Sequence, residues 1–268
     1  MILLDGKSLS ENILSDLKLK IEDCRLSAKG GSASGGKINL DIILVGDNPS
    51  SLKYIALKQK RASEIGIGGQ LYHLPDTISQ NQILELFNKL NKNHDTAAYF
   101  IQLPIPNIRQ ISSLLNNISI HKDADGLNPN SGVTPAVVRG IISLLKHYQI
   151  PFDNQNIVIV NDSNLIGQPL KKYFSDFTPQ IILLNDQTTN LASFTKKADI
   201  IISATGVKNL ITAEMVKEGV IVVDVGGGDI DYENVCKKSA YITPTFGGVG
   251  PMTVASLLEN TYTLATRK

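Results

Sequence analysis

Short apolar runs alternate with helix-like stretches along most of the chain. Seven of these runs are typical of strands: residues 38–46, 68–74, 96–102, 156–160, 180–184, 198–206 and 219–228. Strands that alternate with helices along a chain form parallel sheets covered by helices. The pattern therefore predicts an α/β protein built from two successive series, with the boundary between them near residues 130–150.

Both ends of the chain are predicted to be helical. Ser8 and Glu11 form a capping-box pattern, and apolar positions then recur near helical spacing at Leu9, Ile13, Leu17, Ile21 and Cys24. Residues 28–37 are rich in glycine and serine and predict a flexible surface spacer. The last predicted helix, residues 252–268, has no strand after it, so we expect it to pack back on the first series.

Length and composition suit two globular domains. The chain has 268 residues, of which 42% are hydrophobic and 19% charged, as is ordinary for a soluble protein. We place the first domain at residues 1–138, together with the C-terminal helix at 252–268. The second domain takes residues 139–251.

Charge and cysteine usage exclude several classes of function. Lys and Arg number 26 against 25 for Asp and Glu, and the net charge of +1 argues against a nucleic-acid or membrane-surface partner. Cys24 and Cys236 are far apart and lack metal-ligand neighbours, so we predict no disulfide and no metal site. No apolar run approaches the roughly 20 residues of a membrane span, and the N-terminus does not resemble a signal peptide. We expect a cytoplasmic protein.

Polar or glycine-containing turns follow the strands of the second series. They include residues 161–169, 203–209 and 225–229. Glycines also end strands for conformational reasons alone, but the ordered set predicts a dinucleotide site, because such ligands sit beyond the carboxyl ends of parallel strands. Asp162 lies in the first turn and Asp186 follows the second strand, where an acid commonly accepts hydrogen bonds from the ribose hydroxyls of NAD. Both acids could instead be solvated loop residues.

The first series carries a candidate chemical site. Tyr54 and Lys58 are four residues apart on a predicted helix and share a face, which suits proton transfer if the lysine is buried. This spacing also occurs in short-chain dehydrogenases, but here the pair precedes the nucleotide-like series and no TGxxxGxG turn is present. Gln102 ends a strand, and Asp123 and Asp125 lie in a later turn. Spacing alone does not show that these side chains converge.

Four segments together resemble the bifunctional methylenetetrahydrofolate dehydrogenase/cyclohydrolase family. They are VGDNPSSLKYIALKQKRASEIGI at 45–67, IQLPIP at 101–106, KDADG at 122–126 and ITPTFGGVGPMTVASLLENT at 242–261. The resemblance runs essentially end to end, in the family's order. It implies an N-terminal α/β catalytic domain and a Rossmann-like dinucleotide-binding domain, with the C-terminal helix packing back on the first.

The same resemblance implies two activities. One is oxidation of 5,10-methylenetetrahydrofolate with NAD or NADP, and the other is hydrolysis of the methenyl product to 10-formyltetrahydrofolate. Both belong to one-carbon metabolism and serve purine biosynthesis. Family members usually form homodimers, which we expect here.

Individual roles also follow from the resemblance. Lys58 is the central catalytic group, Tyr54 lines the folate, Gln102 hydrogen-bonds the lysine and helps set its protonation, and Asp125 anchors the pterin ring. Further substrate contacts are assigned to Ser51, Gly248 and Pro251. Cofactor contacts are assigned to Asp162, Ser163, Gly167, Asp186, Thr205, Gly206, Gly250 and Thr253.

The chain departs from the family at several positions. Asp162 stands where the family has an arginine that meets the 2′-phosphate of NADP, and Asp186 stands where it has a serine, so we predict that NAD is preferred and NADP disfavoured. Thr245, Phe246 and Val133 also differ, and the loop after the KDADG segment is shorter. These changes leave open an enzyme with only one activity, or a non-catalytic binding paralogue. Survival of all four catalytic residues favours an active enzyme.

Overall fold

A computed structural model describes residues 1–28, 37–108 and 110–267. The chain forms two compact units, each containing one parallel sheet. The three-stranded unit comprises Asn12–Ala136 and Val254–Lys268, and the six-stranded unit comprises Met1–Glu11 and Val137–Thr253.

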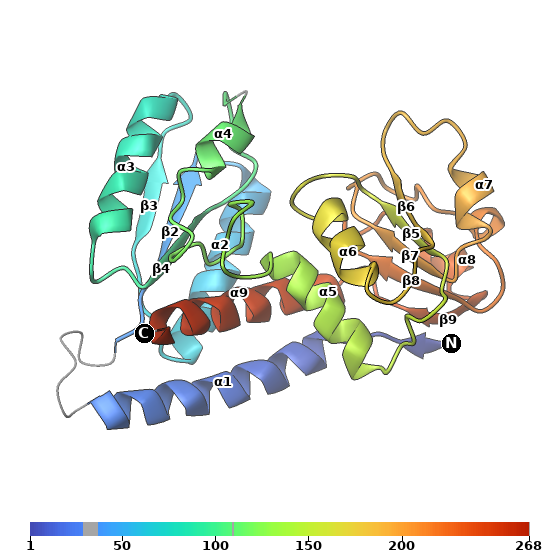
Figure 1. Ribbon diagram of the computed structural model, residues 1–268, viewed down its shortest axis with the longest axis horizontal. Helices are drawn as coiled ribbons and strands as arrows, with labels where there is room; N and C mark the ends of the chain where they lie inside the picture. Colours follow the sequence, from blue (N-terminus) through green and yellow to red (C-terminus); the bar gives the residue numbers. More distant parts are fainter. Residues whose placement is uncertain (29–36, 109, 268) are drawn as a thin grey trace. The chain divides into compact units, whose positions relative to one another are not determined.

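The three-stranded unit contains the sheet β3-β2-β4 (Figure 1). Its strands are β2 (Leu40–Val45), β3 (Leu71–Leu74) and β4 (Ala98–Ile101), all parallel. The three strands predicted for the first series are therefore confirmed. Helices α2 (Pro49–Glu64) and α3 (Gln80–Lys92) connect them, and the short helix α4 (Ile111–Leu115) follows β4.

The two faces of this sheet bury different helices. Leu40, Ile42 and Leu44 alternate along β2 and join a core cluster with residues of α1 (Gly6–Ala28), α2 and α9 (Val249–Thr266). On the other face, Tyr99 of β4 packs against Phe87 of α3, with ring centroids 5.7 Å apart. Helices on both faces explain why β2 and β4 are buried along their whole length.

Local sequence explains where α2 and α3 begin. The side chain of Asn48 accepts hydrogen bonds from the backbone of Ser50 and Ser51, and Pro49 occupies the first turn of α2. A capping box between Ser79 and Gln82 starts α3. Both helices therefore begin at fixed points after the carboxyl ends of their strands.

The six-stranded unit contains the sheet β1-β9-β8-β7-β5-β6, with every pair parallel (Figure 1). Its strands are β1 (Ile2–Leu3), β5 (Ile157–Val160), β6 (Ile181–Leu184), β7 (Ile200–Ser203), β8 (Val220–Asp224) and β9 (Ser239–Ile242). The helices are α5 (Ala136–His147), α6 (Gly167–Phe174), α7 (Leu191–Thr195), the 3₁₀ turn η1 (Ala213–Met215) and α8 (Tyr232–Val235). The chain reverses direction across the sheet between β5 and β7, which is the switch point where doubly wound sheets bind ligands.

The structure corrects two local predictions and confirms a third. Helix α1 begins at Gly6, because the Asp5 carboxylate accepts hydrogen bonds from the backbone and hydroxyl of Ser8; the predicted capping box at Ser8 and Glu11 is wrong. Strands β1 and β9 were not predicted, since β1 is two residues long and β9 is partly polar. Helix α9 packs back on the three-stranded unit from Val254 onward, as predicted.

The glycine- and serine-rich spacer and the absence of a membrane span were also predicted. Of the predicted spacer at 28–37, residues 29–36 lie outside the described residues. None of the helices described is both long and apolar enough to cross a membrane.

Candidate active site

Lys58 is a buried lysine of the three-stranded unit. It lies on α2 with a side chain only 2% exposed, yet it carries an amine. Its Nζ donates a hydrogen bond to Oε1 of Gln102 at 3.1 Å and lies 3.9 Å from Oδ2 of Asp125. The structure therefore brings together three residues that sequence spacing could not connect.

Two aromatic rings complete the surroundings of this amine. Nζ lies 4.8 Å from the ring centroid of Tyr54, which is one helical turn earlier on α2, and 4.2 Å from that of Phe100 on β4. The face of an aromatic ring attracts a cation, but it does not replace the hydrogen bonds that water would give an ammonium group. Burial accordingly lowers the pKa of Lys58 below that of an ordinary lysine, and the charge of Asp125 opposes this shift in part.

Gln102 is held where it can reach the lysine. It directly follows β4, and its backbone N–H donates to the carbonyl of Ile43 in the neighbouring strand. Its side-chain Nε2 donates to the carbonyl of Leu103 at 2.8 Å, which leaves Oε1 turned toward Lys58. An amide in this orientation accepts a hydrogen bond without adding charge.

The loop that presents Asp125 is organised by Asp123. The Asp123 carboxylate is fully buried and accepts hydrogen bonds from the backbone of Leu127 at 3.0 Å and Asn128 at 2.8 Å. Burial raises the pKa of Asp123 to about 6, against these hydrogen bonds. Of the two acids of this motif, Asp123 thus shapes the loop and Asp125 faces the amine.

Ser51, predicted to bind substrate, is also in this unit. It is buried in the first turn of α2, and its backbone N–H donates to the Asn48 cap at 3.0 Å. It lies two turns before Lys58 on the same helix.

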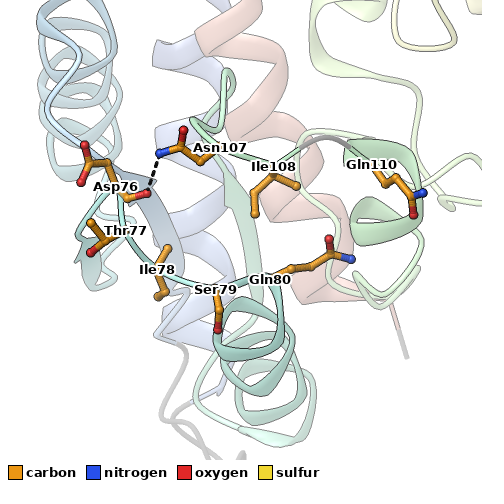
Figure 2. Close-up of a pocket in the computed structure, with 8 residues that line it drawn as sticks. All are labelled: Asp76, Thr77, Ile78, Ser79, Gln80, Asn107, Ile108 and Gln110. Carbon is orange, nitrogen blue, oxygen red and sulfur yellow. Dashed lines mark hydrogen bonds between the residues drawn. The ribbon is translucent and has the colours of Figure 1, made fainter.

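A separate hollow in this unit lies between the start of α3 and the segment after β4. Figure 2 shows its lining of mostly neutral side chains, with Asn107 donating from Nδ2 to the carbonyl of Asp76 at 3.1 Å. None of the predicted site residues lines this hollow. It contains one carboxylate and no paired acid and base, so it is not where we locate the chemistry.

In the six-stranded unit, the turn after β5 is organised by Asn161. Its Oδ1 accepts hydrogen bonds from the backbone and hydroxyl of Ser163 and from the backbone of Gly167. Its Nδ2 donates to the carbonyl of Ala204 beyond β7, at 2.8 Å. Only glycine fits at 167, since an added Cβ would lie 2.0 Å from the carbonyl oxygen of Asn161.

Asp162 and the end of β6 lie together. The Nδ2 of Asn185 donates to Oδ2 of Asp162 at 2.9 Å, which joins the turns after β5 and β6. Asp186, the next residue after Asn185, is exposed. Two acids therefore border the region that follows β5 and β6, on one side of the switch point.

The turns after β7 and β8 form the wall of a pocket on the other side of the switch point. Its lining includes Gly206, Gly226, Gly227, Gly228 and Phe246. Phe246 is 87% exposed, and an added Cβ at Gly206 or Gly228 would meet no atom within 4 Å. Exposed backbone of this kind allows a planar ligand to approach closely, so the residues present suit a nucleotide.

The remaining predicted residues lie near the start of α9 and directly after β7. Gly248 precedes the helix and is buried, while Gly250, Pro251 and Thr253 lie in its first turns with at least partial exposure. Thr205 and Gly206 are exposed after β7. All six residues belong to the six-stranded unit, whereas Lys58 and its partners belong to the three-stranded unit.

Sequence reasoning missed four residues that shape these sites. Phe100 lies against the lysine, Asn161 organises the first turn, and the buried Asp224 and Asp229 hold the last two turns. A polar residue at the end of an apolar run was an available signal for Asn161 and Asp224. Asp229 carried no such signal, because its partners follow a different strand. Within residues 1–28, 37–108 and 110–267, no three His, Cys, Asp or Glu side chains gather as metal ligands would.

Comparison with known proteins agrees with this arrangement. The family description "Tetrahydrofolate dehydrogenase/cyclohydrolase, catalytic domain" matches residues 4–125, and its "NAD(P)-binding domain" counterpart matches residues 135–268. The bifunctional protein FolD of Campylobacter jejuni is 40% identical over 287 aligned residues, which cover 100% of this chain and 99% of that protein.

Solved structures show the same similarity in three dimensions. The bifunctional FolD enzyme of Campylobacter jejuni superposes with a TM-score of 0.90 at 40% identity and covers 99% of this chain and 98% of its own. A Trypanosoma brucei methylenetetrahydrofolate dehydrogenase-cyclohydrolase, solved with NADP and an inhibitor, has a TM-score of 0.90 at 25% identity and covers 100% of this chain and 98% of its own. The matches over both domains, together with relatives 40% identical over the full length, show that this chain belongs to the tetrahydrofolate dehydrogenase/cyclohydrolase family.

Proposed function

We propose that this chain oxidises 5,10-methylenetetrahydrofolate to 5,10-methenyltetrahydrofolate, hydrolyses that product to 10-formyltetrahydrofolate, and prefers NAD to NADP. The observation that carries the two activities is a buried lysine whose amine contacts Gln102 and faces Asp125. Full-length similarity to bifunctional enzymes supports the same conclusion.

Lys58 acts as the base of the hydrolytic step. Its lowered pKa increases the fraction of neutral amine, which can take a proton from water as the oxygen attacks the cationic methenyl carbon. The bond between that carbon and N5 then breaks as N5 takes up a proton and the new hydroxyl group loses one, which leaves the formyl group on N10. Gln102 accepts one N–H of the amine and thereby directs the nitrogen lone pair. Because Gln102 is neutral, it orients the amine without stabilising the protonated form as a carboxylate would.

Substrate positioning falls to the residues around the lysine. Asp125 accepts hydrogen bonds from the pterin ring, and Tyr54 and Ser51 line the folate on the same helix. Gly248 and Pro251, at the start of α9, are the other proposed substrate contacts. Orientation of the reacting carbon is the main requirement of hydride transfer, for which bound NAD supplies the hydride acceptor.

The proposed NAD preference rests on the two acids beyond β5 and β6. Asp162 accepts a hydrogen bond from Asn185, which ties its carboxylate to the end of β6, and a ribose of a dinucleotide commonly lies beyond the second strand of such a sheet. Asp162 and Asp186 accept from ribose hydroxyls and repel a 2′-phosphate. Ser163, Gly167, Thr205, Gly206, Gly250 and Thr253 provide the remaining cofactor contacts.

The experiment measures both activities and both cofactors. Purified protein receives methylenetetrahydrofolate with NAD or with NADP, and absorbance is followed in the bands of the reduced cofactor and the methenyl compound. Faster reduction of NAD supports the preference, and decay of supplied methenyl compound supports the hydrolase. Reduction without hydrolysis, or the reverse, identifies an enzyme with a single activity. Folded protein that is silent in both assays contradicts the proposal and favours a binding paralogue.

The cytoplasmic location and the homodimer stay predictions. Analytical ultracentrifugation tests the second of these, with a single species at twice 29.1 kDa expected.

A further inference from the structure

We propose that Asp229 is a positioning residue, whose carboxylate occupies the anion-binding centre of the turn after β7 and holds that turn in its cofactor-binding shape. The inference rests on the proposed function, because it concerns the same dinucleotide site. The Asp229 side chain is fully buried, so it acts on the cofactor through Thr205 and Gly206, whose backbone N–H groups it holds.

Four donors of the β7 turn converge on this carboxylate. Oδ2 accepts from the Ser203 hydroxyl at 2.7 Å, and from the backbone and hydroxyl of Thr205 at 2.7 Å and 2.9 Å. Oδ1 accepts from the backbone of Gly206 at 2.8 Å. Successive backbone N–H groups that point to one place form an anion-binding nest, and here the protein fills the nest with its own carboxylate.

The neighbouring turn is built around this insertion. An added Cβ at Gly226 would lie 2.0 Å from Oδ1 of Asp229, so glycine is required for the carboxylate to enter. Asp224, at the end of β8, accepts from the backbone of Gly227 at 2.8 Å and Gly228 at 2.9 Å. The backbone of Asp229 also approaches Asp224 Oδ1 at 3.4 Å, which links the two carboxylates in one network.

This network determines which part of a dinucleotide can lie at the β7 turn. The donors that would hold a phosphate are already satisfied, and a second anion would meet the charge of Asp229. The side of Thr205 and Gly206 that faces away from Asp229 is exposed, and Gly206 lines the pocket with Gly227 and Gly228. The turn therefore receives an uncharged part of the cofactor, and the pyrophosphate lies at the turn after β5.

The test replaces the carboxylate and then returns it as a small molecule. Asp229→Ala leaves four donors around a space that formate can fill. We expect the affinity for NADH, measured by fluorescence titration, to fall by about 10- to 100-fold, as loss of charge-assisted hydrogen bonds implies. Formate should restore most of the loss and raise the melting temperature of the variant, whereas chloride at equal ionic strength should not. Methenyl hydrolysis uses no nicotinamide cofactor, so its rate should fall much less than the affinity for NADH does.

Controls separate this role from a purely structural one. Asp176→Ala removes an exposed carboxylate elsewhere in the six-stranded unit, so NADH affinity should not fall and formate should have no effect. If Asp229→Ala does not fold, Asp229→Asn is measured in its place. The amide nitrogen of this variant faces N–H donors, so the affinity for NADH should fall. Formate should not restore it, because the amide already fills the space. Unchanged NADH affinity, or a loss that formate does not reverse in Asp229→Ala, overturns the inference. Absence of NADH binding in the unmodified protein counts against the proposed function, while the formate-dependent melting shift still tests the role of Asp229.

Discussion

Nζ of Lys58 lies 3.1 Å from Oε1 of Gln102, although the two residues are 44 positions apart in the chain. The contact joins the face of α2 to the carboxyl end of β4. It gives a buried amine one neutral acceptor, with a carboxylate at the longer distance of 3.9 Å. Burial lowers the pKa of the Lys58 amine below that of an ordinary lysine, which increases the fraction of neutral amine.

Replacement of Lys58 by methionine should remove hydrolysis while preserving the fold. Met fills the space of the lysine stem but cannot accept a proton, so we expect the methenyl hydrolysis rate to fall at least about 100-fold. The free energy of unfolding should not fall, because a buried ammonium pays a desolvation cost that Met does not. Lys60→Met on the same helix is the control, since that side chain is 73% exposed. Hydrolysis at the unmodified rate in Lys58→Met would remove the lysine from the mechanism.

Gln102→Glu should shift the pH dependence of hydrolysis upward. A carboxylate in contact with Nζ stabilises the ammonium, so the pKa of Lys58 should rise and hydrolysis should require a higher pH. The measurement is the hydrolysis rate across a pH series. Gln59→Glu places the same charge on an exposed position of α2 and should leave the profile in place. An unmoved profile in Gln102→Glu would mean that Lys58 is not the titrating base.

Asp162→Arg combined with Asp186→Ser should raise the use of NADP. The change removes two negative charges beyond β5 and β6 and adds a guanidinium that can pair with a 2′-phosphate. We expect the ratio of kcat/KM for NAD to that for NADP to fall by at least about tenfold, which equals about 1.4 kcal/mol. Asp176→Arg, at an exposed position elsewhere in the same unit, controls for total charge. A constant ratio would place both acids outside the ribose site.

Asp123→Asn should remove a pH dependence of stability. The pKa of Asp123 is raised from 3.8 to about 6, so the folded state binds a proton more tightly than the unfolded state does. By linkage, this group stabilises the protein fully below pH 4 and loses that contribution as pH rises toward 6, by roughly 2–3 kcal/mol.

The neutral variant should lack that fall in stability between pH 4 and 6. Its unfolding free energy should also be lower by about 1–2 kcal/mol at pH 4, because its amide nitrogen cannot accept from the Leu127 or Asn128 backbone. Urea titrations at several pH values measure both effects, with the exposed Asp176→Asn as the comparison. A slope equal to that of the unmodified protein would assign the proton to another group.

The sequence alone determined the class of fold and much of the chemistry. Short apolar runs predicted β2 to β8, and the strands β2, β4, β5, β7 and β8 are buried along their whole length, as a strand covered on both faces requires. The motif around Tyr54 and Lys58, with the later segments that resemble the family, predicted the family to which the chain belongs. The apolar runs are recognised from local physics, whereas the family was recognised from the resemblance of these segments to known motifs.

Tertiary structure decided which distant side chains meet. Strand β1 is identified by its pairing with β9, since two apolar residues carry no pattern of their own. Gln102 reaches Lys58 because parallel pairing of β2 and β4 sets the end of one strand beside the helix that follows the other. Asp229 enters the β7 turn because Gly226 has no side chain. Each of these contacts joins segments that are far apart in the sequence. The sequence separation does not indicate how close they lie in space, and their proximity is specified only by the folded chain.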